Sequence, residues 1–269
     1  VGSFVPPKLL PQMADTSEIV EYAKSLPNLT VVALVPNFMG AKNAIDAGVD
    51  KMCLPLSVSE THSQANLRKT HDEVLKEIGK ITEYLNTLNE NERPEFEGNL
   101  STAFGCTIEG KVSEKDVVSL GVKMMELGCD EVGLSDTTGY ANPAQIKRLI
   151  RLLKKEVGHN NLTSMHLHNT RGLGLANALA SLEEGITTLD SSLGGIGGCP
   201  FAPGASGNIV TEDLVFMLDS MGLKTGIDLE ALIEVNRIVK TCLPNEELYG
   251  FTVDSGLPKG YSEGGWGTN

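Results

Sequence analysis

Two histidines placed two positions apart are the residues of this sequence best suited to bind a metal ion. His166 and His168 stand at the end of an apolar run, in the segment MHLHN at 165–169. On a β-strand, residues two apart face the same side of the sheet, so both imidazoles would point in one direction. A divalent ion is favoured there when oxygen ligands converge on the same point, and Asn208 could supply an amide oxygen. Mg²⁺ or Mn²⁺ suits this donor set, and Zn²⁺ is also possible. Without such convergence the pair would be structural.

A cysteine in a loop of small residues is the second chemical feature. Cys199 lies within LGGIGGCPFAPGASGN at 193–208, where six of sixteen residues are glycine and prolines 200 and 203 stiffen the chain. Such a loop does not fill a core, so we expect the thiol to be accessible. A thiol with an ordinary pKa is mostly protonated near neutral pH and can act as a proton donor.

Two acidic residues lie at the ends of predicted secondary-structure elements, and each has both a structural and a catalytic interpretation. Asp136 ends an apolar run, where it could be a catalytic acid or base or simply a turn or cap residue. Glu212 follows Thr211 at the start of a helix, where capping explains it as well as a role in the site does. The remaining cysteines, at 53, 106, 129 and 242, are more typical of small buried hydrophobic residues.

Short apolar runs alternate with amphipathic segments along the chain. The predicted strands are 31–35, 51–56, 96–104, 131–135, 162–168 and 187–192, and 1–5 looks like the end of one more. The predicted helices include 66–88, 143–157, 173–184 and 229–243, one beginning at Asp15 and one after Ser113, where Asp116 completes a capping-box-like start.

The alternation favours a parallel sheet, and the polar residues favour its closure into a (β/α)8 TIM barrel. Asn37, Asp136, His166 and the glycine-rich loop all follow predicted strands, and barrel enzymes build their sites at the carboxyl ends of the strands. We therefore expect an α/β fold with a single catalytic domain over 1–269, ending in C-terminal helices and a tail.

Composition excludes some classes of protein. A formal net charge of −13 and a pI near 4.8 argue against a general binder of nucleic acid or anionic membranes. No apolar run reaches the roughly 18 residues of a membrane span. Five widely spaced cysteines suit a reducing compartment better than a disulfide framework, so we expect a cytoplasmic protein.

Taken together, the motifs resemble those of the 3-hydroxy-3-methylglutaryl-CoA (HMG-CoA) lyases of the DRE-TIM metallolyase group. The segments that carry the resemblance are SFVPPKLLPQMAD, LVPNFMGAKNAIDAG, VSETHSQANLRKT, FGCTIEGKVS, GLSDTTGYANP, HLHNTRG and LDSSLGGIGGCPFAPGASGNIVTEDL. They extend over nearly the whole chain. The cysteine-containing glycine loop separates the lyases from related synthases.

The resemblance implies roles for individual residues. His166, His168 and Asn208 match the metal ligands of the family, and Cys199 its catalytic cysteine. Asp136, Glu212 and His166 are further catalytic candidates, and Asn37, Thr102 and Thr137 are weaker candidates for substrate contact. The implied reaction cleaves an acyl-CoA thioester, HMG-CoA, to acetyl-CoA and acetoacetate with Mg²⁺ or Mn²⁺, as in leucine degradation and ketone body metabolism. It also implies a homodimer, in the mitochondrial matrix if the source is eukaryotic.

One departure from the family pattern concerns the start of the chain. The family's first strand carries an Arg-Asp-Gly motif with a metal-binding aspartate, and this sequence has none. Only six strands and the end of a seventh can be identified. We therefore expect the barrel to lack its first βα unit and most of strand 2, and a segment of roughly 40 residues to precede Val1 in the natural protein. A degenerate relative is the alternative.

Three other functions stay open from the sequence. A lyase for a related 3-hydroxyacyl-CoA, such as a citramalyl-type substrate, would keep the same chemical groups. A Claisen-type synthase for isopropylmalate or citramalate shares the His-x-His motif, although the Cys-Pro loop weighs against it. A non-catalytic, metal-stabilised barrel is favoured only if the missing opening segment is truly absent.

Overall fold

The computed structural model describes residues 1–197 and 207–261, which fold around one curved parallel sheet. Its strand order is β1-β2-β3-β4-β5-β6, so each strand pairs with its neighbours in sequence. Strictly sequential parallel order requires a crossover between every pair of strands, as the alternation of apolar and amphipathic segments predicts. The strands are β1 (Val32–Leu34), β2 (Lys51–Ser57), β3 (Glu95–Ser101), β4 (Glu131–Asp136), β5 (Leu162–Leu167) and β6 (Thr188–Asp190).

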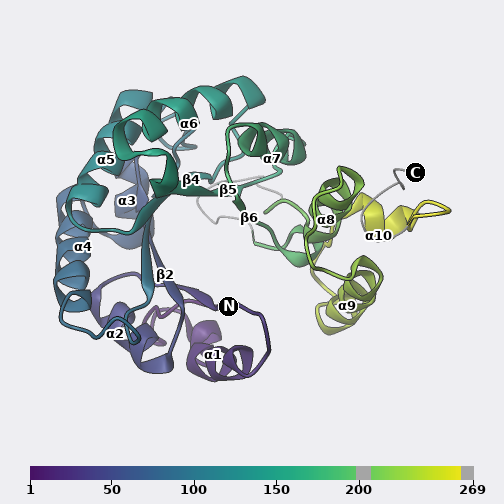
Figure 1. Ribbon diagram of the computed structural model, residues 1–269, viewed down its shortest axis with the longest axis horizontal. Helices are drawn as coiled ribbons and strands as arrows, with labels where there is room; N and C mark the ends of the chain where they lie inside the picture. Colours follow the sequence, from purple (N-terminus) through teal and green to yellow (C-terminus); the bar gives the residue numbers. More distant parts are fainter. Residues whose placement is uncertain (198–206, 262–269) are drawn as a thin grey trace.

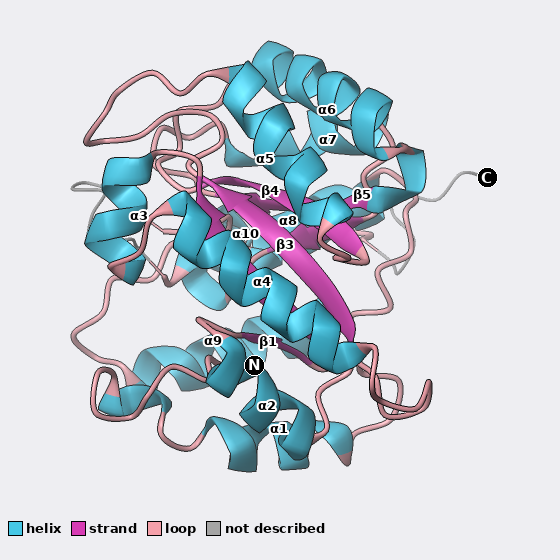
Figure 2. Ribbon diagram, turned by 90° about the vertical axis from the view of Figure 1, so that its left-hand side faces the viewer, coloured by secondary structure: helices cyan, strands magenta, loops and turns pink. Residues whose placement is uncertain are grey.

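Helices cover the convex side of this sheet, with α2, α4, α5 and α6 arranged around it (Figure 1), and α4 lying across it in the side view (Figure 2). The helices that precede the glycine-rich loop are α1 (Thr16–Lys24), α2 (Phe38–Ala47), α3 (Glu60–Leu67), α4 (His71–Leu85), α5 (Glu114–Glu126), α6 (Pro143–Val157) and α7 (Gly174–Glu183). After it come α8 (Thr211–Ser220), α9 (Leu229–Cys242) and α10 (Phe251–Ser255). The α/β fold of TIM-barrel type is confirmed by this arrangement.

The helix over 143–157 shows why the sequence folds locally as it does. Its bounds are those predicted, and the Asn142 side chain accepts a hydrogen bond from the backbone N–H of Gln145. Pro143 occupies the first turn, where its missing N–H costs nothing. The apolar stripe, with Ile146, Leu149 and Leu153 fully buried, packs toward the sheet.

The sheet is apolar on its convex side and polar on its concave side. Residues that face the helices are fully buried, as Leu54, Phe96 and Leu134 show. On the concave side, the Lys51 ammonium lies 2.7 Å from Glu97 and also pairs with Glu131. The core of the molecule therefore lies between the sheet and its helices, and the concave side is left to polar groups.

On the concave side, a series of hydrogen bonds continues from these ion pairs on β2 across β3 to β4. Asn99 Nδ2 donates to Glu97 Oε1 at 3.1 Å, and Ser135 Oγ donates to Asn99 Oδ1 at 2.5 Å. Ser135 is the register partner of His166 on the neighbouring strand. These hydrogen bonds therefore connect the Lys51 ion pairs at the start of β2 to Ser135, which lies beside His166.

Lys51→Met is expected to lower the free energy of unfolding by about 3–5 kcal/mol, because it leaves two buried carboxylates without a cation. The side chains of Lys51, Glu97 and Glu131 are only 11%, 6% and 13% exposed. Urea denaturation followed by circular dichroism would measure the loss. Lys24→Met is the matched control, since the Lys24–Asp50 pair is 40% and 35% exposed and should cost less than about 1 kcal/mol. Equal losses in the two variants would contradict this assignment.

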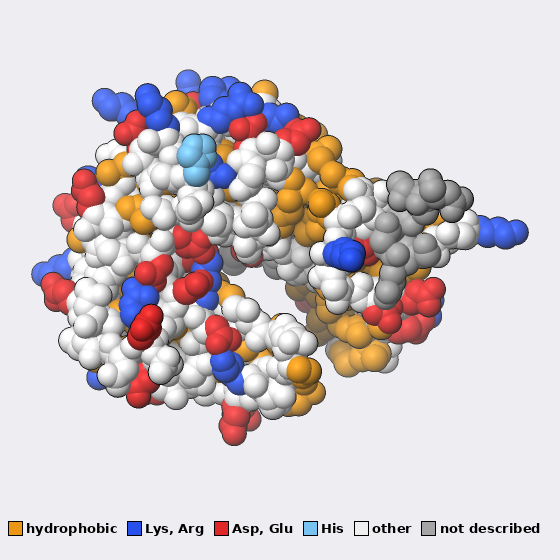
Figure 3. All heavy atoms as spheres, in the orientation of Figure 1, with side chains coloured by type: hydrophobic (Ala, Val, Ile, Leu, Met, Phe, Trp, Pro, Cys, Tyr) orange, Lys and Arg blue, Asp and Glu red, His pale blue; other side chains and the backbone are white. Residues whose placement is uncertain are grey.

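The sheet does not close within the described residues. One edge is β1, extended by residues 1–4 through a parallel bridge between Ser3 and Leu34, and the other follows β6 through a bridge between Ser192 and Val210. The space-filling view shows the molecule hollowed between the N-terminal part and the C-terminal helices (Figure 3). The open edges agree with the incomplete barrel predicted from the strand count.

The structure differs from two predicted element boundaries and from one predicted helix cap. The helix predicted over 66–88 is two helices, because Arg68 takes a left-handed conformation with φ 56° and Thr70 caps α4 in a capping box with Glu73. The third strand ends at Ser101, not at residue 104, where the chain turns. Ser113 is the N-cap of α5, but its side chain makes no capping hydrogen bond.

The C-terminal helices have a small apolar cluster of their own, in which Val215, Leu229 and Ile233 are buried. Cys106 and Cys129 are buried as expected. Cys242 at the end of α9 is exposed to solvent, and Cys53 is partly exposed. The expectation of a packing role for Cys242 was therefore wrong. Within 1–197 and 207–261, no helix combines the length and the apolar character that crossing a membrane requires.

Candidate active site

The two histidines meet at the carboxyl end of β5. The Nε2 atoms of His166 and His168 lie 3.1 Å apart, and Nδ1 of His166 is 3.1 Å from the Asp190 carboxylate. Asp190 is the register partner of His166 on β6, which explains the contact. A carboxylate on one ring nitrogen orients the ring and leaves the other nitrogen for a ligand. Two ligand nitrogens at about 2.1 Å from one ion and at right angles would be about 3 Å apart.

Asn208 lies beside this pair and presents an oxygen with no partner. An antiparallel bridge joins His168 to Asn208. The Asn208 Nδ2 donates to the carbonyl of Ile196 at 2.9 Å, while its buried Oδ1 has no hydrogen-bond partner among the described residues. A buried amide oxygen without a partner costs free energy, which a bound cation would recover.

The protonation state of His168 also fits a metal ligand. Burial, followed by the nearby charge of His166, lowers the pKa of His168 to about 4. The imidazole is therefore neutral at physiological pH, the form that binds metal ions. Over 1–197 and 207–261 no three residues of the types His, Cys, Asp and Glu cluster as a ligand set. The Asn208 amide oxygen is the unpartnered oxygen beside the histidines that fits a third donor.

Asp136 is fully buried at the end of β4 and holds the loop that follows it. Its carboxylate accepts hydrogen bonds from the backbone N–H groups of Tyr140, at 2.9 Å, and Ala141, at 3.2 Å. Burial raises the pKa of Asp136 to about 6, against the two backbone hydrogen bonds and the charge of Arg171, which lower it. A carboxyl group with such a pKa can take and return a proton near neutral pH. Its turn role and a chemical role are therefore compatible.

The structure does not place Glu212 against the histidines. Its buried carboxylate accepts the backbone N–H of Gly194 at 3.2 Å and the side-chain amide of Asn236 at 2.5 Å. Glu212 thus connects the start of the glycine-rich loop to α9. We describe it as a positioning residue rather than one that contacts substrate.

Thr102 and Thr137 join three loops at the carboxyl ends of the strands. The backbone N–H of Ser59 donates to Thr102 Oγ1 at 3.2 Å, and the backbone N–H of Thr102 donates to Thr137 Oγ1 at 2.9 Å. Thr102 has a φ of 55°, a region that β-branched residues avoid. Such a conformation persists only when its surroundings hold it, and these two hydrogen bonds are part of that support.

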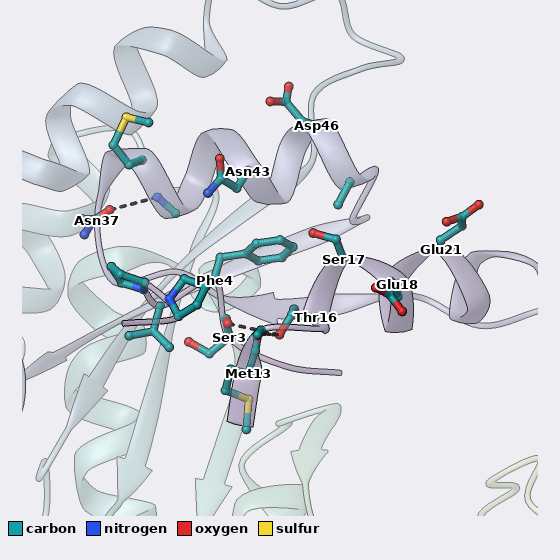
Figure 4. Close-up of a pocket in the computed structure, with 17 residues that line it drawn as sticks. Ser3, Phe4, Met13, Thr16, Ser17, Glu18, Glu21, Asn37, Asn43 and Asp46 are labelled. Atoms are coloured by element: carbon teal, nitrogen blue, oxygen red, sulfur yellow. Dashed lines mark hydrogen bonds between the residues drawn. The ribbon is translucent and has the colours of Figure 1, made fainter. Parts of the chain in front are cut away.

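Asn37 lies in a different part of the molecule. Its side chain caps α2 by accepting the backbone N–H of Gly40 at 2.9 Å, and it borders a cavity of 840 Å³ between α1, α2 and the N-terminal segment (Figure 4). Glu18, Glu21 and Asp46 also line this cavity, and His166 and His168 do not. Carboxylates around a cavity disfavour the phosphates of a CoA ester.

Cys199 lies outside the described residues, but both flanks of its segment are described. The backbone N–H of Asn169 donates to the carbonyl of Gly207 at 3.0 Å, next to His168. A Cβ on Gly207 would fall 2.1 Å from the carbonyl oxygen of Gly195, so only glycine permits this approach. Residues 195 and 207 therefore meet at the side of the site formed by His168 and Asn208.

Asp190 and Asn236 belong to this arrangement, and the sequence reasoning missed both. Asp190 could have been found, because it stands at the end of the strand next to β5 and parallel neighbours of this kind share an edge. Asn236 gave no local signal, since only the packing of α9 brings it to Glu212.

Comparisons with known proteins agree on one family. The model of the HMGL-like family matches residues 9–239. Hydroxymethylglutaryl-CoA lyase YngG of Bacillus subtilis is 38% identical over 89% of this chain and 79% of its own length. The mitochondrial hydroxymethylglutaryl-CoA lyase of Bos taurus is 37% identical, over 88% of this chain and 71% of its own.

Solved structures give the same result. An HMG-CoA lyase from Acenitobacter baumannii, in complex with coenzyme A and 3-methylmalate, superimposes with a TM-score of 0.88 at 41% identity and covers 97% of this chain and 83% of its own. The HMG-CoA lyase of Pseudomonas aeruginosa has a TM-score of 0.85 at 33% identity, and the match covers 94% of this chain and 83% of that structure's chain. A family model that spans most of the chain and relatives of this similarity establish the assignment. The chain belongs to the HMGL-like family.

Proposed function

We propose that this chain is a metal-dependent carbon–carbon lyase that cleaves HMG-CoA to acetyl-CoA and acetoacetate. The observation that carries the proposal is the convergence of His166, His168 and the unpartnered Asn208 oxygen at one strand end. The relatives named hydroxymethylglutaryl-CoA lyase support the choice of reaction. The CoA bound in a similar lyase structure supports an acyl-CoA substrate.

His166, His168 and Asn208 are the residues that would hold the ion. When bound, Mg²⁺ or Mn²⁺ supplies Lewis acidity that lowers the pKa of the substrate's tertiary hydroxyl. The neutral imidazoles and the amide oxygen add no charge, so the full charge of the ion remains available to the substrate.

Proton transfer falls to residues of the chain. Asp136, whose pKa is about 6, takes the proton of the tertiary hydroxyl. His166, the other candidate base, has Nδ1 at Asp190 and its Nε2 at the proposed ion, so no ring nitrogen is left to take a proton while it binds the metal. Breakage of the carbon–carbon bond then leaves the ketone of acetoacetate and passes the electron pair to the acetyl-CoA enolate. Cys199 donates a proton to the enolate carbon and gives acetyl-CoA. The proton on Asp136 returns to the thiolate, which completes the cycle.

The threonines at the strand ends support substrate binding in this proposal. Thr137 accepts a hydrogen bond from the backbone of Thr102, so its own hydroxyl hydrogen remains available to a substrate oxygen. Thr102 is fully buried and orders the loops instead. Asn37 has its side-chain oxygen engaged in capping α2, which leaves only its amide hydrogens for a ligand.

The same reasoning extends to the context of the enzyme. We propose one catalytic domain that works as a homodimer. Related lyases are mitochondrial in Bos taurus and cytoplasmic in Mus musculus, which supports the mitochondrial matrix or the cytoplasm for this chain.

The experiment is a product assay on the purified protein with HMG-CoA and Mn²⁺ or Mg²⁺. We expect acetyl-CoA and acetoacetate in equal amounts, and loss of activity on adding EDTA, restored by excess metal. Citramalyl-CoA in parallel tests the related acyl group. Cleavage of citramalyl-CoA alone, or no cleavage of either ester by protein that binds Mn²⁺, would overturn the proposed reaction.

A further inference from the structure

Three loops at the carboxyl ends of β3, β4 and β5 are locked together by Tyr140 and Arg171. The Arg171 Nη1 donates to the carbonyls of Thr138, at 3.1 Å, and Gly139, at 3.2 Å. Its guanidinium carbon lies 4.5 Å from the centre of the Tyr140 ring, in the range of a cation–π contact. Arg171 therefore spans from the loop after β5 to the loop after β4.

The third loop reaches the same ring through Gly105. A Cβ on Gly105 would stand 2.6 Å from Cδ2 of Tyr140, so the ring lies directly on this backbone. Thr138 Oγ1 also donates to the carbonyl of Gly105 at 3.0 Å. The Tyr140 ring is thus fixed by Gly105 as well as by Arg171. We call Gly105, Thr138, Tyr140 and Arg171 the loop clamp.

The loop clamp holds the donors that Asp136 needs. The backbone N–H of Tyr140 binds Asp136 Oδ1 at 2.9 Å, and that of Ala141 binds Oδ2 at 3.2 Å. A fully buried carboxylate cannot remain ionised without such donors. Arg171 binds the carbonyls of Thr138 and Gly139, which directly precede Tyr140, so it holds the backbone that presents these two N–H groups to the carboxylate.

We propose that Arg171 is a positioning residue for Asp136: it fixes the loop over 138–141, so that the backbone N–H groups of Tyr140 and Ala141 stay in place on the Asp136 carboxylate. This inference rests on the proposed lyase function, in which Asp136 takes the proton. Arg171 acts in two ways, through the two carbonyls that it binds and through its charge, which favours the ionised carboxylate. No direct contact between Arg171 and substrate is required.

The test compares Arg171→Gln and Arg171→Lys with the full chain. Arg171→Gln should lower kcat for HMG-CoA cleavage about 10- to 100-fold and leave KM within about threefold, as supporting residues around a site typically do. Arg171→Lys keeps the positive charge but loses the planar guanidinium group, so its kcat should lie between those of the wild type and Arg171→Gln. Free guanidinium ions at millimolar concentration should partly restore kcat in Arg171→Gln. Arg151→Gln is the control, because the exposed Arg151 pairs with Glu184 at the end of α7 and makes no contact with the loop clamp.

Hydrogen exchange provides a readout that needs no activity. Without substrate, the amides of Tyr140 and Ala141 should exchange at least about tenfold faster in Arg171→Gln than in the wild type, because their local opening becomes easier. Unchanged exchange would overturn the inference even if the wild type cleaved HMG-CoA. A raised KM with unchanged kcat would also overturn it, since Arg171 would then bind substrate. A wild type inactive on HMG-CoA, with faster exchange in the variant, would count against the proposed function alone.

Discussion

Cys199→Ala is expected to lower kcat for HMG-CoA cleavage by about 10³-fold while the affinity for Mn²⁺ stays unchanged. The thiol is proposed as the proton donor to the enolate, and positioned acids contribute about 10²- to 10⁴-fold. The proposed ligands are His166, His168 and Asn208, so removing the thiol leaves this donor set intact. Steady-state kinetics and calorimetric titration with Mn²⁺ would measure the two quantities.

Cys242→Ser is the matched control for this variant. Cys242 is exposed at the end of α9, and its replacement should leave kcat within about twofold of the wild type. Normal turnover in Cys199→Ala would remove this residue from the mechanism. Loss of Mn²⁺ binding in the same variant would instead make it a ligand.

His168→Ala is expected to weaken Mn²⁺ binding by more than about 100-fold and to lower kcat by at least about 10³-fold. Its imidazole is buried and neutral, its Nε2 faces His166, and its Nδ1 has no hydrogen-bond partner in the described part of the chain. Removing it takes away one of three proposed donors. Electron paramagnetic resonance of Mn²⁺ would report binding separately from activity.

His159→Ala serves as the control, because His159 is an exposed histidine after α6. His168→Asn gives a second variant that keeps a polar side chain in the buried position. Wild-type affinity for Mn²⁺ in both replacements of His168 would show that the ion binds elsewhere.

Elements whose signals are local could be predicted from the sequence. The bounds of α6 follow from Asn142, Pro143 and the apolar stripe, all within one segment. The sequential strand order follows from the alternation together with the polar residues at the strand ends, which favoured a barrel over an open sheet. The proximity of His166 to His168 follows from the two-residue repeat of a strand.

Features that depend on tertiary contacts could not be predicted. The break at Arg68 contains no glycine or proline, so the residues that usually end a helix do not mark it. The exposure of Cys242 depends on which face of α9 packs against α8, and α9 carries apolar residues on more than one face. The position of Glu212 depends on Asn236, which is 24 residues away.

The polar concave side of the sheet has a consequence for how this protein could change over evolution. Alternate residues of β2 to β4 serve separate purposes: those facing the helices supply the apolar core, and those facing inward supply polar contacts. Substitutions at inward positions such as Asn99 and Ser135 remove little of the packing that stabilises the fold. New acyl specificities could therefore arise by exchange of a few inward side chains, with Lys51 and its two carboxylates as the inward group that selection for stability would retain.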